Sequence, residues 1–177
     1  MNKVVFLDRD GTIIADKHYL SDPAGVELLP NAALGLQSMK EQGFSLVIVS
    51  NQSGIGRGYF SNHDLMACMD RLEELLKPYD VTFDAVLYCP HAPEEECTCR
   101  KPLTGMVTES SVSFDPARSA VVGDKACDVN LGKALNCDGI LVRTGKGAAE
   151  EAKNSCSPHF IGDDLLAVAD YLRNNKK

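Results

Sequence analysis

The sequence predicts an α/β protein in which helices cover both faces of a parallel sheet. Five short runs of β-branched and apolar residues indicate buried strands: residues 4–7, 46–49, 85–88, 120–122 and 140–142. Helical patterns separate these runs, and crossover helices are the usual connection between parallel strands. Polar clusters follow four of the runs, where open sheets of this kind bind their ligands. We therefore expect three layers, with the functional residues at the carboxyl edge of the sheet.

Helices are predicted at five places: residues 31–42, 62–77, 104–113, 126–135 and 163–173. Ser61 is expected to cap the second helix, with Asp64 in its first turn and Pro78 at its end. The glycine-rich residues 145–147 and the polar residues 150–158 are expected to form a mobile surface loop. Because strand and helix alternate through most of the chain, the predicted architecture is a Rossmann-like parallel sheet.

The composition is that of an ordinary globular protein. Of the 177 residues, 44% are hydrophobic and 24% are charged, so we expect a single domain over residues 1–177. No apolar run approaches the roughly 18 residues that cross a bilayer, and the N-terminus lacks a signal-peptide pattern. A cytoplasmic protein is therefore predicted. The net charge of -7 argues against nucleic-acid and membrane partners, whereas a small anionic substrate still fits a locally basic site.

The chain has seven cysteines, an odd number that does not suit a disulfide framework without a secretory signal. Cys68, Cys127, Cys137 and Cys156 are scattered, and each is expected to be buried as a small apolar group. The other three are clustered between residues 89 and 99, so metal binding is a separate hypothesis for them.

Cys89, His91, Cys97 and Cys99 supply three thiolates and one imidazole within eleven positions. This set is sufficient for a closed tetrahedral Zn²⁺ site with a structural role. Such an ion would stabilise a loop with little apolar content and would position the residues that follow it. The alternatives are reduced cysteines in a flexible acidic loop, which contains residues 94–96 (Glu-Glu-Glu), and a redox switch.

Asp8 and Asp10 lie two positions apart directly after the first predicted strand. Like charges this close repel each other, and a divalent cation shared with a third acid, Asp124, would relieve the repulsion. Mg²⁺ prefers carboxylate and carbonyl oxygens and commonly binds substrate phosphate as well. Taken singly, such an aspartate pair is also typical of a turn followed by a helix cap.

Three further features indicate a phosphate site. Ser50 offers a hydroxyl at the end of the second predicted strand, residues 54–56 (Gly-Ile-Gly) can bend closely around an anion, and Lys101 can neutralise charge. Alone, Ser50 with Asn51 fits a loop with a helix cap, and Lys101 fits a solvated surface charge. Their common order after the predicted strands favours phosphoryl transfer.

These residues resemble the four ordered motifs of the haloacid dehalogenase superfamily phosphatases. The matching segments are residues 8–12 (Asp-Arg-Asp-Gly-Thr), 50–52 (Ser-Asn-Gln), 101–102 (Lys-Pro) and 123–124 (Gly-Asp) with Asp128. The loop 51–58 and the cysteine cluster joined directly to residues 100–102 (Arg-Lys-Pro) resemble the D-glycero-D-manno-heptose 1,7-bisphosphate phosphatase subgroup. That subgroup also includes histidinol-phosphate phosphatases. The resemblance covers nearly the whole chain.

The resemblance implies a role for each matching residue. Asp8 would be the nucleophile that forms an aspartyl-phosphate, and Asp10 the general acid and base. Asp8, the backbone carbonyl of Asp10 and Asp124 would hold Mg²⁺. The remaining implied roles fall to residues that hold the phosphate oxygens or support the site: Ser50, the backbone of Asn51, Lys101 and Asp128. Asp128 would orient Lys101 or a metal-bound water, although a simple helix cap explains it as well.

The spacing of the motifs leaves no room for a large cap domain, so short loops must select the substrate. These are residues 14–29 and 52–59, which include Gln52, together with Arg100 and Lys146. Arg57 and Arg100 are expected to pair with a second phosphate or a sugar hydroxyl, unless they are simply solvated.

Ile14 departs from the subgroup, which commonly has Asn at this position, and it raises the question of an altered sugar preference. The zinc-like loop is also short, with five residues between His91 and Cys97. Neither departure falls on a matching catalytic position, so both bear on the identity of the substrate rather than on the type of reaction.

The function implied by the resemblance is Mg²⁺-dependent removal of the C7 phosphate of a heptose 1,7-bisphosphate, in the synthesis of bacterial surface-glycan precursors such as lipopolysaccharide. The expected partner is a small phosphorylated sugar, and the expected oligomeric state is a monomer. The alternatives are histidinol-phosphate hydrolysis and a catalytically silent, zinc-stabilised binding module. A nucleic-acid 3′-phosphatase fits less well, because no basic and aromatic binding stretch is present.

Overall fold

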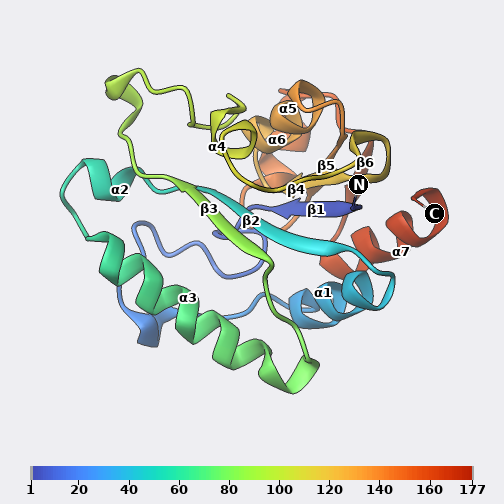
Figure 1. Cartoon of the computed structure of the whole chain (residues 1–177), viewed down its shortest axis with the longest axis horizontal. Coiled ribbons are helices and arrows are strands. Elements are labelled where there is room, and N and C mark those ends of the chain that lie inside the picture. The colour runs from blue at the N-terminus through green and yellow to red at the C-terminus, as the bar shows by residue number, and fades with distance from the viewer. Residues whose placement is uncertain (1, 177) are drawn as a thin grey trace.

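A computed structural model describes residues 2–176 and shows a six-stranded parallel sheet, with strand order β3-β2-β1-β4-β5-β6 (Figure 1). The strands are β1 (Val4–Leu7), β2 (Ser45–Asn51), β3 (Ala85–Cys89), β4 (Ala120–Gly123), β5 (Asp138–Val142) and β6 (Phe160–Gly162). β1 lies in the middle and pairs with β2 on one side and β4 on the other. The predicted parallel architecture is thereby confirmed.

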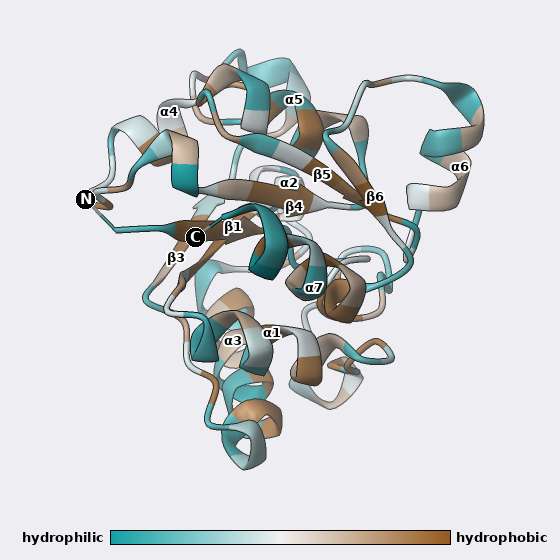
Figure 2. Cartoon of the chain, turned by 90° about the vertical axis from the view of Figure 1, so that its right-hand side faces the viewer, coloured by the Kyte–Doolittle hydropathy of each residue, from teal (hydrophilic) through white to brown (hydrophobic). Residues whose placement is uncertain are grey.

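Helices cover both faces of the sheet (Figures 1 and 2). The longer helices on one face are α1 (Ala32–Glu41), α3 (Asn62–Leu76) and α7 (Leu165–Asn175). The other face carries α4 (Gly105–Thr108) and α5 (Ala126–Ala134), and the remaining helices are α2 (Ser53–Gly56) and α6 (Gly147–Lys153). Short 3-10 turns occur at four places: Pro23–Gly25, Lys77–Tyr79, Pro93–Glu95 and Pro116–Arg118.

The two faces of the sheet produce two apolar clusters, because side chains alternate along each strand. In β1, Val5 and Leu7 pack toward α1, α3 and α7, whereas Val4 and Phe6 pack toward α4 and α5. The strands are accordingly hydrophobic along their length, as Figure 2 shows. The predicted cap of α3 is also confirmed: the Ser61 hydroxyl accepts from the Asp64 N–H, and the Asp64 carboxylate accepts from the Ser61 N–H. Among residues 2–176, no helix is long and apolar enough to cross a membrane.

Two parts of the chain differ from the predicted secondary structure. Residues 145–147 and 150–158 were predicted as loop, but residues 147–153 form α6, because Ala, Glu and Lys after Gly147 are good helix formers. Residues 160–162 form a sixth strand, β6, which is too short to detect from its own pattern and is defined by pairing with β5. β6 lies at the edge of the sheet, whereas α6 begins beside Asp124.

The third predicted helix, residues 104–113, is shortened to a single turn, α4. The serine-rich residues 110–113 do not continue it, since serine side chains compete for the backbone hydrogen bonds of a helix. For example, the Ser110 hydroxyl donates to the Val107 carbonyl and accepts from the Val112 N–H.

The predicted full burial of residues 85–88 was wrong, since β3 is an edge strand and its residues 85–88 are half-buried. The four scattered cysteines are also not alike. Cys68 and Cys137 are buried as predicted, whereas Cys127 and Cys156 are half-buried. Cys127 lies at the cavity described below rather than in the core.

Candidate active site

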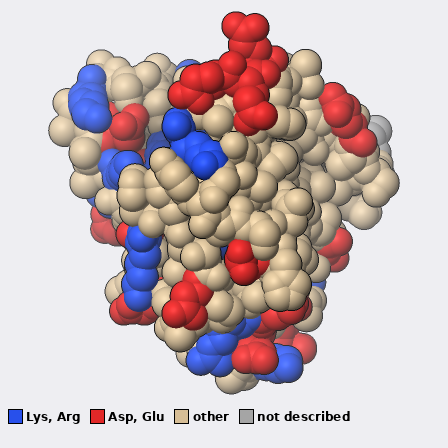
Figure 3. All heavy atoms as spheres, turned by 90° about the vertical axis from the view of Figure 1, so that its left-hand side faces the viewer, with Lys and Arg blue, Asp and Glu red and all other residues tan. Residues whose placement is uncertain are grey.

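The predicted site residues meet at the carboxyl edge of the sheet, on the side of the molecule where α2 and the loop after β3 lie (Figure 1). Asp8 follows β1, Ser50 and Asn51 end β2, and Asp124 follows β4. The chain builds β1, β2 and β3 outward on one side and then crosses to β4 on the other side of β1, so a crevice forms where the order of the strands reverses. Lys and Arg side chains lie on this face beside a projecting group of acidic side chains (Figure 3).

Asp8 is nearly buried, and its contacts hold it as a carboxylate. Its N–H donates to the Val122 carbonyl at 2.9 Å, which ties the residue to β4. The Lys101 ammonium donates to Asp8 Oδ1 at 2.8 Å and to the Val49 carbonyl at 2.8 Å. Burial opposes ionisation, but Lys101 and Lys125 outweigh it and lower the pKa of Asp8. The site therefore presents an ionised carboxylate at the end of β1.

Asp128 is fully buried in the first turn of α5, and its Oδ1 lies 2.6 Å from the Lys101 nitrogen. Lys101 thus bridges Asp8 and Asp128. Burial disfavours the ammonium, yet the two carboxylates outweigh it and raise the pKa of Lys101. Burial raises the pKa of Asp128 to about 7 against the pull of Lys101. The arrangement fixes Lys101 as a cation beside Asp8.

Asp124 is also fully buried, and backbone groups hold its position. Its Oδ2 accepts from the Lys146 N–H at 2.9 Å. A side chain at Gly11 would strike this same oxygen, and Gly11 has a φ of 89°, so glycine allows the turn after Asp10 to approach the carboxylate. Burial, followed by repulsion from Asp8, raises the pKa of Asp124 to about 6. Two neighbouring carboxylates therefore need a cation if both are to be ionised.

Lys125 supplies a cation at this place. Its Nζ lies 3.1 Å from Asp124 Oδ1, 3.4 Å from the Asp10 carbonyl oxygen and 3.7 Å from Asp8 Oδ2. These are the oxygens that the sequence predicts as ligands of Mg²⁺. The Lys125 ammonium occupies the position expected for Mg²⁺. The donors around it are all oxygens, which fit a hard divalent cation. Burial opposes the charge of Lys125, but Asp8 and Asp124 outweigh it and raise the pKa of Lys125.

Arg9 and Gln52 hold the carboxylate of Asp10. The Arg9 Nε and Nη2 donate to the two carboxylate oxygens at 3.0 Å and 3.1 Å, and the Gln52 amide donates to Oδ2 at 3.0 Å. Gln52 also donates to the Ser50 hydroxyl at 2.7 Å, so it joins the ends of β1 and β2. Arg9 is among the largest fully buried side chains in the described structure. The two guanidinium donors of Arg9 fix the direction of the Asp10 carboxylate.

The Asn51 side chain braces the backbone of Lys101. Its Oδ1 accepts from the Lys101 N–H at 3.0 Å, and its amide nitrogen donates to the Lys101 carbonyl at 3.3 Å. The Asn51 side chain therefore holds Lys101 in place, while the phosphate contact predicted for Asn51 involves its backbone.

Two adjoining cavities open over these residues. One, of about 160 Å³, is lined by Asp8, Asp10, Asn51, Arg100, Lys101, Lys125 and Cys127. The other, of about 190 Å³, shares Asp10, Asn51 and Lys125 and adds residues from the loop after β1. Arg100 reaches the first cavity, and its Nη1 is buried without a hydrogen-bond partner. Arg57 instead pairs with Glu94 at 3.3 Å, on the loop after β3.

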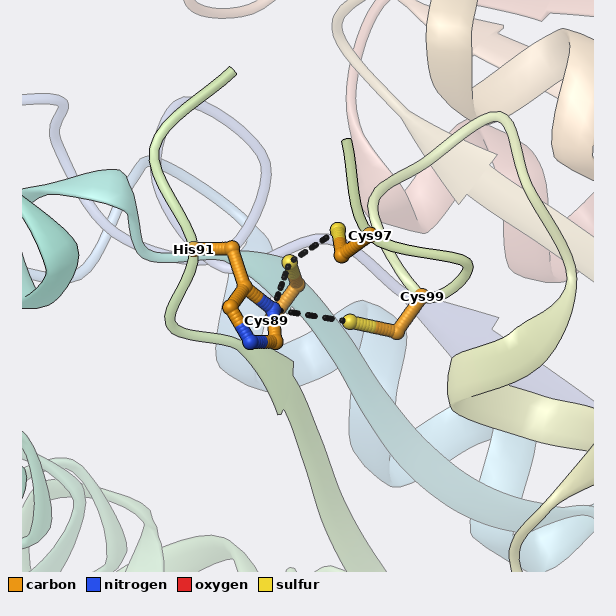
Figure 4. A group of neighbouring side chains, drawn as sticks. All are labelled: Cys89, His91, Cys97 and Cys99. Carbon is orange, nitrogen blue, oxygen red and sulfur yellow. Dashed lines mark hydrogen bonds between the residues drawn. The ribbon is translucent and has the colours of Figure 1, made fainter. Parts of the chain in front are cut away.

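The four predicted zinc ligands converge, although they come from two ends of a loop (Figure 4). The Cys89 sulfur lies 3.6 Å from the Cys97 sulfur and 3.6 Å from His91 Nδ1, which lies 3.3 Å from the Cys99 sulfur. A tetrahedral ion with Zn–S bonds of about 2.3 Å holds its sulfurs roughly 3.8 Å apart. The separations therefore fit one zinc ion.

The thiols of this cluster differ in pKa. Burial raises the pKa of Cys89 to about 12. Burial also opposes ionisation of Cys97, but the N–H groups of Arg100 and Cys99 lower its pKa to about 7. All three cysteines are free of disulfides. A metal cation would allow the three to be thiolates together, since a coordinating thiol loses its proton.

Sequence reasoning missed Lys125 and Arg9, which both contact predicted site residues. Each directly follows a motif aspartate in the sequence, and that adjacency was the available signal. Lys146, which was expected to help select the substrate, contributes its backbone N–H to Asp124. Ile14 is fully buried in the main apolar cluster, so its side chain packs in the core rather than in either cavity.

Comparison with protein families and curated proteins gives consistent matches. A family model for HAD-hydrolase-like proteins matches residues 98–168. The D-glycero-beta-D-manno-heptose-1,7-bisphosphate 7-phosphatase of Haemophilus influenzae is 35% identical over 186 residues and covers 100% of both chains. The protein of the same name from Escherichia coli is 37% identical, covering 98% of this chain and 95% of the relative.

Solved structures agree with these matches. A D,D-heptose 1,7-bisphosphate phosphatase from B. bronchiseptica, solved with magnesium and phosphate, has a TM-score of 0.89 and 31% identity. The match covers 97% of this chain and 98% of that one. The corresponding phosphatase from Burkholderia thailandensis has a TM-score of 0.75 and 31% identity, with 97% and 99% coverage.

Proposed function

The chain belongs to the D-glycero-D-manno-heptose 1,7-bisphosphate 7-phosphatases of the HAD-like hydrolases, and we propose from this premise that it removes the C7 phosphate of a heptose 1,7-bisphosphate through Asp8. Its substrate is then a small phosphorylated sugar, and its class is phosphoric monoester hydrolase. One observation carries the proposal: an ionised Asp8, held by Lys101 at 2.8 Å, faces a cavity that Asp10 also lines.

In this mechanism, Asp8 attacks phosphorus and forms an aspartyl-phosphate while the bond to the sugar oxygen breaks. Lys101, anchored by Asp128 and braced by Asn51, offsets the negative charge on the phosphate oxygens. Ser50 and the Asn51 backbone hold the remaining oxygens. Arg100 adds a second cation on the same side of the cavity and provides a partner for another phosphate group.

Asp10 acts as general acid and then as general base. It gives a proton to the departing sugar oxygen and takes one from the water that cleaves the aspartyl-phosphate. Arg9 and Gln52 hold its carboxylate in the observed orientation at the side of the cavity. They are positioning residues for Asp10.

Two metal ions complete the proposal. Asp8, the Asp10 carbonyl and Asp124 would hold Mg²⁺, which supplies charge that offsets repulsion between an anionic nucleophile and an anionic phosphate. Cys89, His91, Cys97 and Cys99 would hold a structural Zn²⁺. The supports are the oxygen donor set around Lys125 and the sulfur separations. The cytoplasmic location, the monomeric state and the single domain over residues 1–177 remain predictions.

The test measures kcat/KM for both anomers of heptose 1,7-bisphosphate and for histidinol phosphate, with Mg²⁺ and with EDTA. We expect the heptose bisphosphate to be preferred and phosphorus NMR to show loss of the C7 phosphate. Asp8→Asn removes the nucleophile at constant shape, so kcat should fall by about 10⁴-fold or more. Asp70→Asn, on the exposed face of α3, is the matched control and should retain activity.

Two outcomes would contradict this assignment. A clear preference for histidinol phosphate would overturn the substrate. Equal background rates for the wild type and Asp8→Asn, with and without Mg²⁺, would indicate a silent binding module.

A further inference from the structure

The segment between β5 and α6, residues 143–146, contacts the acidic cluster from outside the residues assigned to catalysis. The Thr144 hydroxyl donates to the Gly11 carbonyl at 2.8 Å, which joins the segment to the turn after β1. Two residues later, the Lys146 N–H donates to Asp124 Oδ2 at 2.9 Å. The β5–α6 segment therefore holds two parts of the site at once, the turn after β1 and Asp124.

Gly145 allows this segment to approach the site closely. Its φ is 55°, a left-handed conformation that favours glycine. A Cβ at Gly145 would overlap Asp124 Oδ2 and would lie 2.7 Å from both the Cα and the carbonyl oxygen of Gly11. A Cβ at Gly11 would overlap the same oxygen of Asp124. Two glycine backbones and one backbone N–H therefore surround Oδ2.

The β5–α6 segment is anchored by contacts that do not involve the acidic cluster. The Arg143 N–H donates to the Gly162 carbonyl of β6 at 2.9 Å. The Arg143 guanidinium donates to both carboxylate oxygens of Glu151 in α6, at 2.7 Å and 2.8 Å. At the other end of the segment, the Gly147 N–H donates to the Thr144 carbonyl at 2.9 Å. The position of Thr144 is therefore set by β6 and α6, and the site is held against it.

The two oxygens of Asp124 are consequently not equivalent. Oδ2 faces the backbone of Gly11, Gly145 and Lys146. Oδ1 lies 3.1 Å from the Lys125 nitrogen, among the oxygens proposed for Mg²⁺. Because Asp124 has no exposed surface, its carboxylate cannot turn unless these neighbours move. Asp124 therefore has one oxygen available for a cation.

The number of available carboxylate oxygens affects which cation fits. Mg²⁺ demands a compact octahedron, keeps several waters and is bound through few carboxylates. Ca²⁺ is larger, takes roughly six to eight oxygen ligands and accepts both oxygens of one carboxylate. An aspartate that offers a single oxygen thus suits Mg²⁺ better than Ca²⁺.

We propose that Thr144 is a positioning residue which, together with Gly145, restricts Asp124 to one available oxygen and so makes the site prefer Mg²⁺ over Ca²⁺. This inference rests on the proposed function, because that function takes Asp124 as a ligand of Mg²⁺. Thr144 acts through the carbonyl of Gly11 and through the backbone that follows it. Loss of its hydroxyl frees the turn after β1 and the β5–α6 segment to separate, which opens Oδ2 to a larger cation.

The test measures the dissociation constants of Mg²⁺ and Ca²⁺ for the full chain by calorimetry. Thr144→Val removes the hydroxyl at nearly constant shape. The dissociation constant of Mg²⁺ should rise about tenfold, a typical effect of losing an outer contact of a metal ligand, while that of Ca²⁺ should stay or fall. Thr144→Ser keeps a hydroxyl and should keep the wild-type ratio. The matched control is Thr108→Val, because the exposed Thr108 hydroxyl donates only within α4, to the Thr104 carbonyl at 3.2 Å.

A pair of glycine variants tests the same contact from the backbone. Gly145→Ala forces a Cβ between Asp124 and Gly11, so the preference for Mg²⁺ over Ca²⁺ should fall by about tenfold or more. Gly43→Ala is the control, since Gly43 has a φ of 82° and a Cβ there would meet only the Lys3 side chain, at 3.8 Å. Both variants carry the strain of a left-handed alanine and should lower the thermal midpoint. Only Gly145→Ala should change the ratio of the two dissociation constants.

Failure of this inference is distinguishable from failure of the proposed function. A heptose bisphosphatase whose Mg²⁺ to Ca²⁺ ratio is unchanged in Thr144→Val and Gly145→Ala would overturn the inference alone, even if both variants were less stable. If another phosphate ester proved the better substrate, the proposed function would fail, while a tenfold change of the ratio would still support the role of Thr144. Wild-type protein that binds no Mg²⁺ would overturn both.

Discussion

Lys125 occupies the centre of the oxygen donors proposed for Mg²⁺, within 3.1 Å of Asp124 and 3.4 Å of the Asp10 carbonyl. An ammonium group and a divalent cation cannot share this place, because both need the same oxygens and repel each other. Lys125 also lines both cavities, so it has space to move toward a bound phosphate. At the residue scale, Lys125 is an internal counter-ion for Asp8 and Asp124.

Lys125→Met tests this competition. Without the ammonium, Mg²⁺ no longer displaces a bound cation, so its dissociation constant, measured by calorimetry, should fall about tenfold. The thermal midpoint in EDTA should also fall, because Asp8 and Asp124 lose their neutralising partner. Lys133→Met, on the exposed side of α5, controls for net charge. Unchanged or weaker Mg²⁺ binding in Lys125→Met would contradict the interpretation.

The burial of Ile14 changes the interpretation of this residue. The sequence raised the question of an altered sugar preference, since its subgroup commonly has Asn there. In the structure, Ile14 has no exposed surface, and its backbone forms bridges with Asp10 and Leu28. Its apolar side chain therefore belongs to the core beneath the loop, whereas Tyr19 on the same loop faces the cavity.

At the element scale, the loop after β3 links the Cys/His cluster to the proposed phosphate site. Cys89 ends β3, and Cys97 and Cys99 directly precede Arg100 and Lys101. Cys97 and Cys99 thus determine where the chain returns to the site. The Asn51 side chain then holds the Lys101 backbone. A substitution in this loop should therefore shift Lys101 even when the substituted residue does not itself contact Lys101 or Asp8.

Cys97→Ser should remove this support. We expect loss of one bound zinc per chain by elemental analysis, a lower thermal midpoint, and a fall in kcat/KM of about tenfold because Lys101 loses its anchor. Cys156→Ser, outside the cluster, should retain zinc and activity. Wild-type protein that contains no zinc after purification without chelators would rule out the structural ion.

The crossing of α1 and α7 depends on Gly35. An added Cβ would lie 2.5 Å from the Leu165 carbonyl carbon and 2.6 Å from its oxygen. Alanine favours a helix by about 1 kcal/mol over glycine, but forcing packed backbones apart costs about 1–3 kcal/mol. Gly35→Ala should therefore lower the free energy of unfolding in urea, with Leu34→Ala as the exposed neighbour for comparison. A more stable Gly35→Ala would mean that helix propensity outweighs this contact.

At the scale of the whole molecule, the order of the strands assembles the site. β1 is central, so Asp8 and Asp10 emerge between the ends of β2 and β4. Lys101 enters from the loop after β3, and Asp128 from α5 completes the group around it. Residues more than ninety positions apart, such as Asp8 and Lys101, are thereby in direct contact. The parallel crossover rule predicted this convergence, because it places the carboxyl ends of all the strands on one edge.

The sequence by itself determined the class of fold, the main helices and the set of motif residues, because apolar periodicity and motif order are local properties of the chain. It also predicted the four ligands of the Cys/His cluster, whose spacing is short. Only the tertiary structure decided that Lys125 lies among the oxygens proposed as Mg²⁺ ligands, that Arg9 orients Asp10 and that Tyr19 lines the cavity. It also decided the sixth strand and the burial of Ile14. These features depend on which side chains meet across distant segments, and packing decides that rather than local pattern.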